Sequence, residues 1–181
     1  VIGVLIAIVV MAVDPIEQLA RGRDAGRKAA VAQLGRAMAA FVTNAQRNTY
    51  PTATDGIIAT NPWQTFLETA GELSNPIVVV AVTGSRTCYG ATPPPGFFQS
   101  NVCYSPTASD AVIWTVLESR SERDRSDGSP GAGSCTATTG QTAAAGGHGF
   151  VVWTSLTGRA GLWCTVAGAV GTVPPANAVL F

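Results

Sequence analysis

The first thirteen residues constrain the fold more than any other part of the chain. They read VIGVLIAIVVMAV and contain no charged or strongly polar side chain. As an α-helix they would extend over about 20 Å, which is less than the roughly 30 Å hydrocarbon thickness of a bilayer. A helix that is apolar on all sides is a poor surface helix of a soluble domain. We expect either a buried helix or the remaining part of a longer membrane segment, and we favour the second interpretation.

Asp14 and Pro15 interrupt this apolar stretch. Proline lacks a backbone N–H and disfavours a helical conformation in the residue before it. Asp14 is a suitable N-cap, and Pro15 a suitable first residue, for a second helix. We therefore expect a kink or a short unwound link at Pro15.

Residues 16–47 have the pattern of an amphipathic helix. Apolar residues recur at intervals of three and four, which places them on one helical face. Glu17 precedes Arg21 by four residues, and Asp24 precedes Lys28 by four, so each pair is predicted to contribute about 0.2–0.5 kcal/mol. The side chains predicted to pack the helix against the rest of the protein are Val31, Leu34, Met38, Phe41 and Val42.

Three glycines lie within this second helix. Gly22, Gly26 and Gly35 each cost about 1 kcal/mol relative to alanine in a helix interior. Gly22 and Gly26 are four residues apart, a spacing that allows another helix to approach closely. Sequence variation on an exposed face explains the pair equally well.

The remainder of the chain is predicted to be rich in β-structure. A short helix is expected at residues 63–73, with Trp63, Phe66, Leu67 and Ala70 on one side. Strands are expected at 77–82, 97–104, 111–118, 149–156 and 160–167, with a hairpin turn at residues 157–159. Alternation in the third strand places Val112, Trp114 and Val116 on one face.

The predicted fold is therefore α+β. A long N-terminal helix in residues 1–50, broken near Pro15, carries an antiparallel β-sheet head formed by residues 51–181. Residues from about 119 to 148 are rich in charged and small side chains and are expected to form a long surface loop. Trp153 and Trp163 are assigned to core or cross-strand packing in preference to a sugar-binding platform.

The four cysteines are interpreted as two disulfides. Their count is even, and their spacing matches no zinc or redox motif. Two disulfides imply an oxidising compartment, whereas four buried thiols would suit a cytosolic protein. Sequence alone leaves three pairings open. Sequential pairing closes the shortest loops and is our expectation, among the candidates Cys88, Cys103, Cys135 and Cys164.

We find no convincing catalytic or metal site in the sequence. The only histidine, His148, lies in a glycine-rich stretch and is interpreted as a solvated side chain, although a Ser-His-Asp arrangement is set by geometry and not by spacing. Asp124, Asp127 and Gly128 lack EF-hand spacing, so a solvated charge run is favoured over a Ca²⁺ site. We expect no enzymatic activity and no cofactor. Eleven basic and eleven acidic residues cancel, so no nucleic-acid partner is expected.

The first fifty residues resemble type IV pilins and type II secretion pseudopilins, most of all the major pseudopilin. The resemblance covers a little over a quarter of the chain and is specific as a block. Its residues are the apolar run 1–13, then Asp14-Pro15-Ile16-Glu17-Gln18, then Ala20-Arg21-Gly22-Arg23-Asp24-Ala25-Gly26-Arg27-Lys28, and finally Asn48-Thr49-Tyr50-Pro51. The leading Phe of that family, and the Glu that follows it by a few residues, would precede Val1. Glu17 lies too far along the chain to take the role of that Glu.

The resemblance implies a subunit whose job is assembly. A leader would be cut by a prepilin peptidase, the subunit would wait in the inner membrane, and an assembly ATPase would extract it into a helical homopolymer outside the cell. The side chains expected in the filament core are Val1, Ile2, Val4, Leu5, Ile6, Ile8, Val9, Val10, Met11 and Val13.

Three functions remain open from the sequence. The first, which we favour, is the subunit of an extracellular type IV pilus used for adhesion, motility or DNA uptake. The second is a pseudopilin that acts as a short piston in secretion. The third is a membrane-anchored extracellular binding module or hydrolase, which a concave pocket with converging polar groups would favour.

Overall fold

The computed structural model describes residues 14–44, 49–52, 62–81, 97–106, 109–119 and 149–164. Two helices and five strands lie in these segments. In chain order they are α2 (Pro15–Asn44), α4 (Trp63–Thr69), β1 (Phe98–Gln99), β2 (Val102–Pro106), β3 (Ala111–Val116), β4 (Gly149–Thr154) and β5 (Arg159–Cys164).

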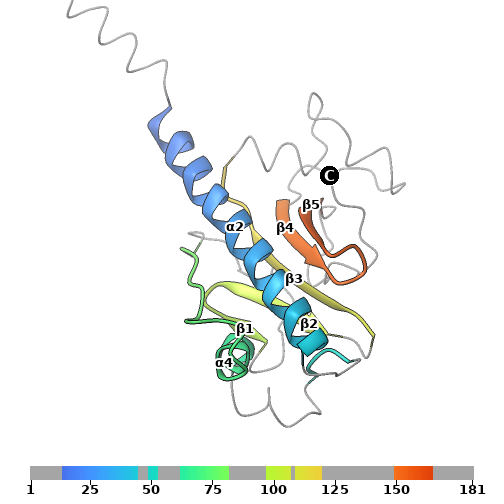
Figure 1. Cartoon of the computed structure of the whole chain (residues 1–181). Helices are drawn as coiled ribbons and strands as arrows, with labels where there is room; N and C mark the ends of the chain where they lie inside the picture. Colours follow the sequence, from blue (N-terminus) through green and yellow to red (C-terminus); the bar gives the residue numbers. More distant parts are fainter. Residues whose placement is uncertain are drawn as a thin grey trace, which may run out of the picture.

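The strands form one antiparallel sheet in the order β1-β2-β3-β4-β5, so each strand pairs with the next one along the chain. Helix α2 lies along one face of this sheet, and α4 lies near the far end of α2, beside β1 and β2 (Figure 1). The predicted α+β class, with a long helix followed by an antiparallel sheet, is confirmed.

Helix α2 begins where its capping residues predict. The Oδ1 atom of Asp14 accepts hydrogen bonds from the backbone N–H groups of Ile16 at 3.1 Å and Glu17 at 3.2 Å. Pro15 is the first helical residue, a position where its missing N–H costs nothing. At 30 residues, the helix is about 45 Å long.

One hydrophobic core fills the space between α2 and the sheet. Its helical side consists of apolar residues spaced by three and four, which meet the inward-facing side chains of β3 and β4 such as Ile113 and Val151. Phe41 packs edge-on against Phe66 of α4, with ring centroids 4.6 Å apart. The structure buries Val31, Leu34, Met38 and Phe41 in this core and packs the partly buried Val42 against it.

Gly35 is the point of closest approach between α2 and the sheet. A Cβ atom on Gly35 would lie 2.3 Å from two ring atoms of Trp153 on β4, far inside van der Waals contact. Glycine has a low helix propensity, but it is required at this position because any side chain would overlap the indole ring. Gly22 and Gly26 differ, since a Cβ on either would meet nothing within 4 Å.

The central strands of the sheet are buried on both faces. Every residue of β3 and β4 is buried. The face turned away from α2 carries a second cluster, and the predicted alternation in β3 is confirmed there. This second cluster consists of Cys103, Val112, Trp114, Val116, Phe150 and Val152, with Trp163 packed against it.

The single strand predicted at residues 97–104 is wrong, because the chain makes a hairpin there. Gln99 pairs with Val102, and the two residues between them have positive φ angles, 55° at Ser100 and 64° at Asn101. Two such residues joining paired strands match a type I′ turn. The sequence signal was weak because Ser-Asn lacks the glycine that usually marks this turn.

The strand predicted at residues 77–82 does not join the sheet over residues 77–81, the part that the structure describes. Residues 77–81 are extended, but their backbone is held by side chains and a turn: Ile77 N–H donates to Gln64 Oε1 at 2.7 Å, and Val79 N–H donates to Ser100 O at 3.2 Å. Asn101 Nδ2 donates to Val79 O at 2.8 Å. A β-branched run favours an extended backbone, but it does not determine whether the backbone finds a strand to pair with.

Helix α4 is shorter than predicted, because the chain turns at Gly71, which has a φ of +82°. Ala70, predicted on the packed side of this helix, is exposed. The polar residue Gln64, which was not predicted on that side, is buried. The hairpin predicted around residues 157–159 is confirmed, with Thr154 paired to Arg159 and Gly158 at a φ of +63°.

Candidate functional site: the anchored helix α2

The beginning of α2 extends past the sheet and is exposed (Figure 1). Burial starts at Ala20, whereas the apolar side chains of Ile16 and Leu19 are 74% and 64% exposed. Residues 1–13, which include all the side chains expected in a filament core, lie outside the described residues. Neither of the two described helices is at once long enough and apolar enough to cross a bilayer.

A cluster of four charged residues fastens α2 to the end of β3. Arg23 binds Glu118 through two hydrogen bonds, with Nε donating to Oε2 at 2.8 Å and Nη2 donating to Oε1 at 2.5 Å. Arg27 is 1% exposed and donates from Nη1 to Asp24 Oδ1 at 2.5 Å and from Nη2 to Glu118 Oε2 at 3.2 Å. Two cations and two anions balance, which offsets the cost of burying them.

Asp24 ties the helix directly to the backbone that follows β3. Its Oδ1 accepts the N–H of Glu118 at 2.9 Å, and its Oδ2 accepts the N–H of Ser119 at 2.8 Å. The predicted ion pair of Asp24 with Lys28 is therefore wrong. The carboxylate of Asp24 instead points inward and binds Arg27 and these two backbone amides. The pairing of Glu17 with Arg21 is confirmed at 3.2 Å.

The cluster favours the ionised form of Glu118. Hydrogen bonding from Arg23 is the main cause that lowers the pKa of Glu118 below its ordinary value; burial acts in the opposite direction, and Arg27 lowers it further. The same pairing raises the pKa of Arg23. All four carboxylate oxygens of the cluster accept hydrogen bonds. Carboxylates engaged in this way hold the helix in place and are poorly suited to act as a general base.

Sequence reasoning missed this cluster, although a signal was present. Asp24 and Arg27 fall at the same helical intervals as Val31 and Leu34, so they continue the buried face of α2 toward its beginning. A charged pair on an apolar face indicates a buried ion pair. The partner at Glu118, some 90 residues later, could not be identified from the sequence.

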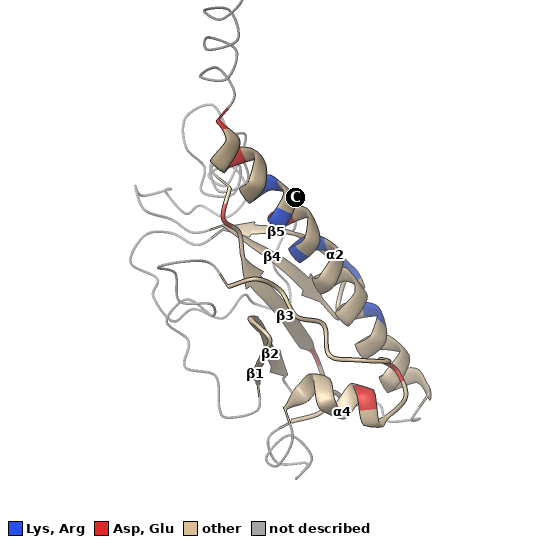
Figure 2. Ribbon diagram, turned by 90° about the vertical axis from the view of Figure 1, so that its left-hand side faces the viewer, with Lys and Arg blue, Asp and Glu red and all other residues tan. Residues whose placement is uncertain are grey.

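Basic residues recur along α2, whose acidic residues are Glu17 in the first turn and the buried Asp24 (Figure 2). Arg21 and Arg36 are exposed, and Arg23 keeps 37% of its side chain exposed despite its bonds to Glu118. The helix thus presents an acidic first turn followed by a basic surface.

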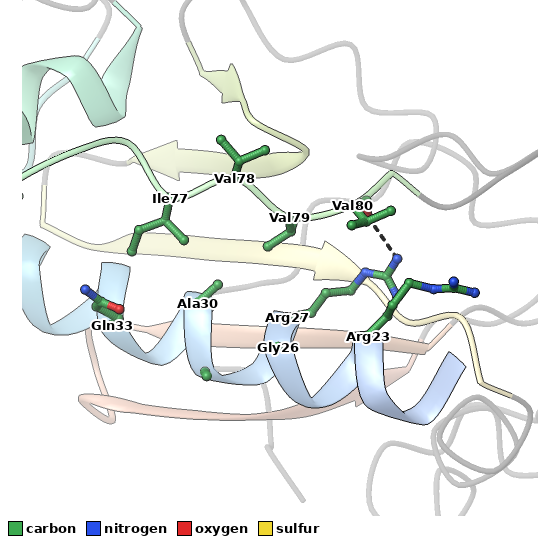
Figure 3. Close-up of a pocket in the computed structure, with 10 residues that line it drawn as sticks. Arg23, Gly26, Arg27, Ala30, Gln33, Ile77, Val78, Val79 and Val80 are labelled. Carbon is green, nitrogen blue, oxygen red and sulfur yellow. Dashed lines mark hydrogen bonds between the residues drawn. The ribbon is translucent and has the colours of Figure 1, made fainter. Parts of the chain in front are cut away.

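A groove runs between α2 and the extended segment 77–80 (Figure 3). Its volume is about 320 Å³. Arg27 crosses one end and donates from Nη2 to Val80 O at 2.9 Å. The residues that line the groove are Arg23, Gly26, Arg27, Ala29, Ala30, Gln33, Ile77, Val78, Val79 and Val80.

The remaining predicted site residues fall in different places. Cys103 is disulfide-bonded and fully buried in the second cluster. Cys164 ends β5, while Cys88 and Cys135 lie outside the described residues, so the sequential pairing stays a prediction. The loop predicted at about residues 119–148 also lies outside them, apart from the buried Ser119, as do His148, Asp124, Asp127 and Gly128.

The described site thus combines a capped helix that extends past the sheet, a balanced ionic anchor and an apolar groove beside that anchor. Comparison of the chain with protein-family models, with curated proteins and with solved structures found no match.

Proposed function

We propose that this protein is a structural subunit that polymerises through its hydrophobic N-terminal helix into an extracellular filament of the type IV pilus kind. The observation that carries the proposal is the exposed beginning of α2, which follows the apolar residues 1–13 in the sequence and leads into a helix packed on the sheet. The subunit is proposed to be membrane-anchored before assembly, to depend on a peptidase and an assembly machinery, and to have no catalytic role.

The apolar side chains at the beginning of the chain are stabilised when they are removed from water. Residues 1–13 and the adjoining Ile16 and Leu19 need a non-aqueous environment, and a bilayer or the bundled helices of neighbouring subunits both supply one. Each large side chain buried in such a bundle contributes about 1.5–3 kcal/mol. Several such residues per subunit, repeated along a polymer, are sufficient to hold it together.

The ionic anchor supports the same function. A helix that carries load from one subunit to the next must not slide on its own head. Asp24 and Arg27 oppose rotation and sliding of α2, because either motion would break their bonds to the backbone near Glu118 and to Val80 O. A merely hydrophobic contact would tolerate small axial shifts.

Electron microscopy tests the proposal. Cells that produce the full chain with its assembly machinery are expected to yield filaments in the fraction sheared from their surface. Antibodies against the head should label those filaments along their length. Monodisperse protein in detergent-free buffer, with label confined to membranes or absent from filaments, would count against the proposal.

A further inference from the structure

We propose that the groove between α2 and residues 77–80 is a docking site for a second copy of this chain, and that it receives the beginning of the neighbour's α2. Ile16 and Leu19 of the neighbour would lie in the groove, with Asp14 of the neighbour beside Arg23. The inference rests on the proposed function and adds a specific contact to it.

The groove has the shape and lining that such a contact needs. The middle of the groove is apolar, from Ala29 and Ala30 on α2 and from Ile77 on the extended segment, and its polar lining residues lie toward the two ends (Figure 3). Gly26 leaves open space where any other residue would place a side chain. Val80, 64% exposed, extends this apolar surface, whereas the side chain of Val78 points away from α2 (Figure 3).

The beginning of α2 has the matching chemistry. Ile16 and Leu19 are three residues apart, so they project from the same side of the helix. Six large apolar side chains are exposed within the described segments; Ile16 and Leu19 are two of them, and Val80 beside the groove is a third. Two separate apolar surfaces on one molecule, each exposed in the monomer, indicate a contact between unlike surfaces of two copies.

The proposed filament sets the direction of the neighbouring helix. Arg23 lies at the end of the groove nearer the start of α2, and Gln33 lies at the other end, one turn before the exposed Arg36. Basic side chains are therefore present near both ends. Copies related by a rise along one filament axis have parallel α2 helices, and in this arrangement Asp14 of the neighbour falls beside Arg23.

An axial shift of nine to ten residues brings the three pairs level. Asp14 and Arg23 differ by nine positions, Ile16 and Gly26 by ten, and Leu19 and Ala29 by ten. This shift corresponds to about 15 Å along the helix. The contact joins the groove of one copy to the helix beginning of the other, so the pair still has one free groove and one free helix beginning. The repeat therefore continues into an open helical polymer and not a closed dimer.

Cysteine crosslinking in the assembled filament tests the contact. Leu19→Cys combined with Ala29→Cys places the two thiols about 15 Å apart within one chain, too far for a disulfide, so any bond between them joins two copies. On mild oxidation, we expect a ladder of dimers and larger species on a non-reducing gel. The control is Leu19→Cys with Ala39→Cys, which lies on an exposed part of the same helix outside the groove.

Two glycine variants supply an independent test. Gly26→Leu fills the groove and Gly22→Leu does not line it, yet neither new side chain meets an atom within the subunit at its Cβ position. Both variants should melt in detergent at or above the temperature of the unmodified protein. Gly26→Leu should lower filament yield by at least about tenfold, the loss expected when one large side chain can no longer be buried. Gly22→Leu should assemble normally.

The outcomes separate this inference from the proposed function. Filaments that form but show no Leu19–Ala29 crosslink, or equal losses in the two glycine variants, would overturn the groove contact and leave filament formation standing. Absence of filaments from the unmodified chain would instead remove the proposed function itself.

Discussion

At the scale of single residues, Gly35 determines how closely α2 can approach the sheet. The indole of Trp153 lies against the helix backbone at this position, in space that a side chain would otherwise occupy. Protein interiors are close-packed, and an indole held between a helix and a sheet has little room to move. Three glycines of one helix therefore have different roles, which helix propensity alone could not distinguish.

We expect Gly35→Ala to destabilise the protein by about 1–3 kcal/mol, because the overpacking cost exceeds the gain in helix propensity. Gly22→Ala should instead stabilise it by up to about 1 kcal/mol, since only the propensity gain remains there. Urea unfolding of the full chain in nonionic detergent, followed by tryptophan fluorescence, measures both. A stabilised Gly35→Ala variant would show that the close approach of Trp153 is wrong.

Glu118 gives stability a predictable dependence on pH. Its pKa is lowered in the folded protein, so its contribution is complete above the ordinary value of 4.5 and is lost as pH falls through the lower folded-state pKa. The stability difference between the unmodified protein and Glu118→Gln should therefore be constant near neutral pH and shrink below about pH 4.5, by an amount on the order of 1 kcal/mol.

Unfolding curves at several pH values measure this difference. Glu68→Gln is the matched control, because Glu68 is a half-buried carboxylate outside the ionic cluster. A difference between Glu118→Gln and the unmodified protein that stays constant down to pH 3 would contradict the role assigned to Arg23 and Arg27.

At the scale of elements, the β1–β2 turn has a second role besides reversing the chain. Ser100 O accepts the N–H of Val79, and Asn101 Nδ2 donates to Val79 O. Asn101 O also accepts from the hydroxyl of Thr115 at 2.8 Å. The turn thus holds one wall of the groove in place, which explains why an asparagine with positive φ serves better here than the more permissive glycine.

Two substitutions at Asn101 separate its conformational role from its hydrogen bond. Asn101→Gly keeps the positive φ and loses one bond, for a cost of about 0.5–1.5 kcal/mol. Asn101→Ala should cost about 1–2 kcal/mol more, because alanine is strained at a φ of 64°. Urea unfolding in detergent compares them, and equal costs for the two variants would argue against a left-handed conformation at this position.

The elements also show what periodicity can and cannot predict. The apolar spacing in α2 and the alternation in β3 were readable because each pattern reports which face of a single element is buried. The β1–β2 hairpin was missed because its turn residues are unusual, and segment 77–81 was misassigned because strand pairing depends on distant partners. The groove could not be predicted at all, since it lies between an element and a segment far apart in the sequence.

At the scale of the whole molecule, the described structure is a helix fixed to one face of a sheet whose central strands are buried on both faces. The fold class followed from the order of elements in the sequence, and the ionic anchor did not, because Glu118 is distant from α2 in the chain. Assembly remains the proposal, and it concerns the parts of α2 that the head leaves uncovered.

The backbone positions on either side of residues 120–148 are held close together by hydrogen bonds. Leu117 N–H donates to Gly149 O at 2.9 Å, and Asp24 secures the amides of Glu118 and Ser119, so the chain departs and returns at neighbouring points that are both pinned. Doubling the length of a flexible connection between fixed ends costs only about 0.6 kcal/mol. The two pinned ends should therefore tolerate changes in the length and sequence of the connection between them at little cost to the sheet.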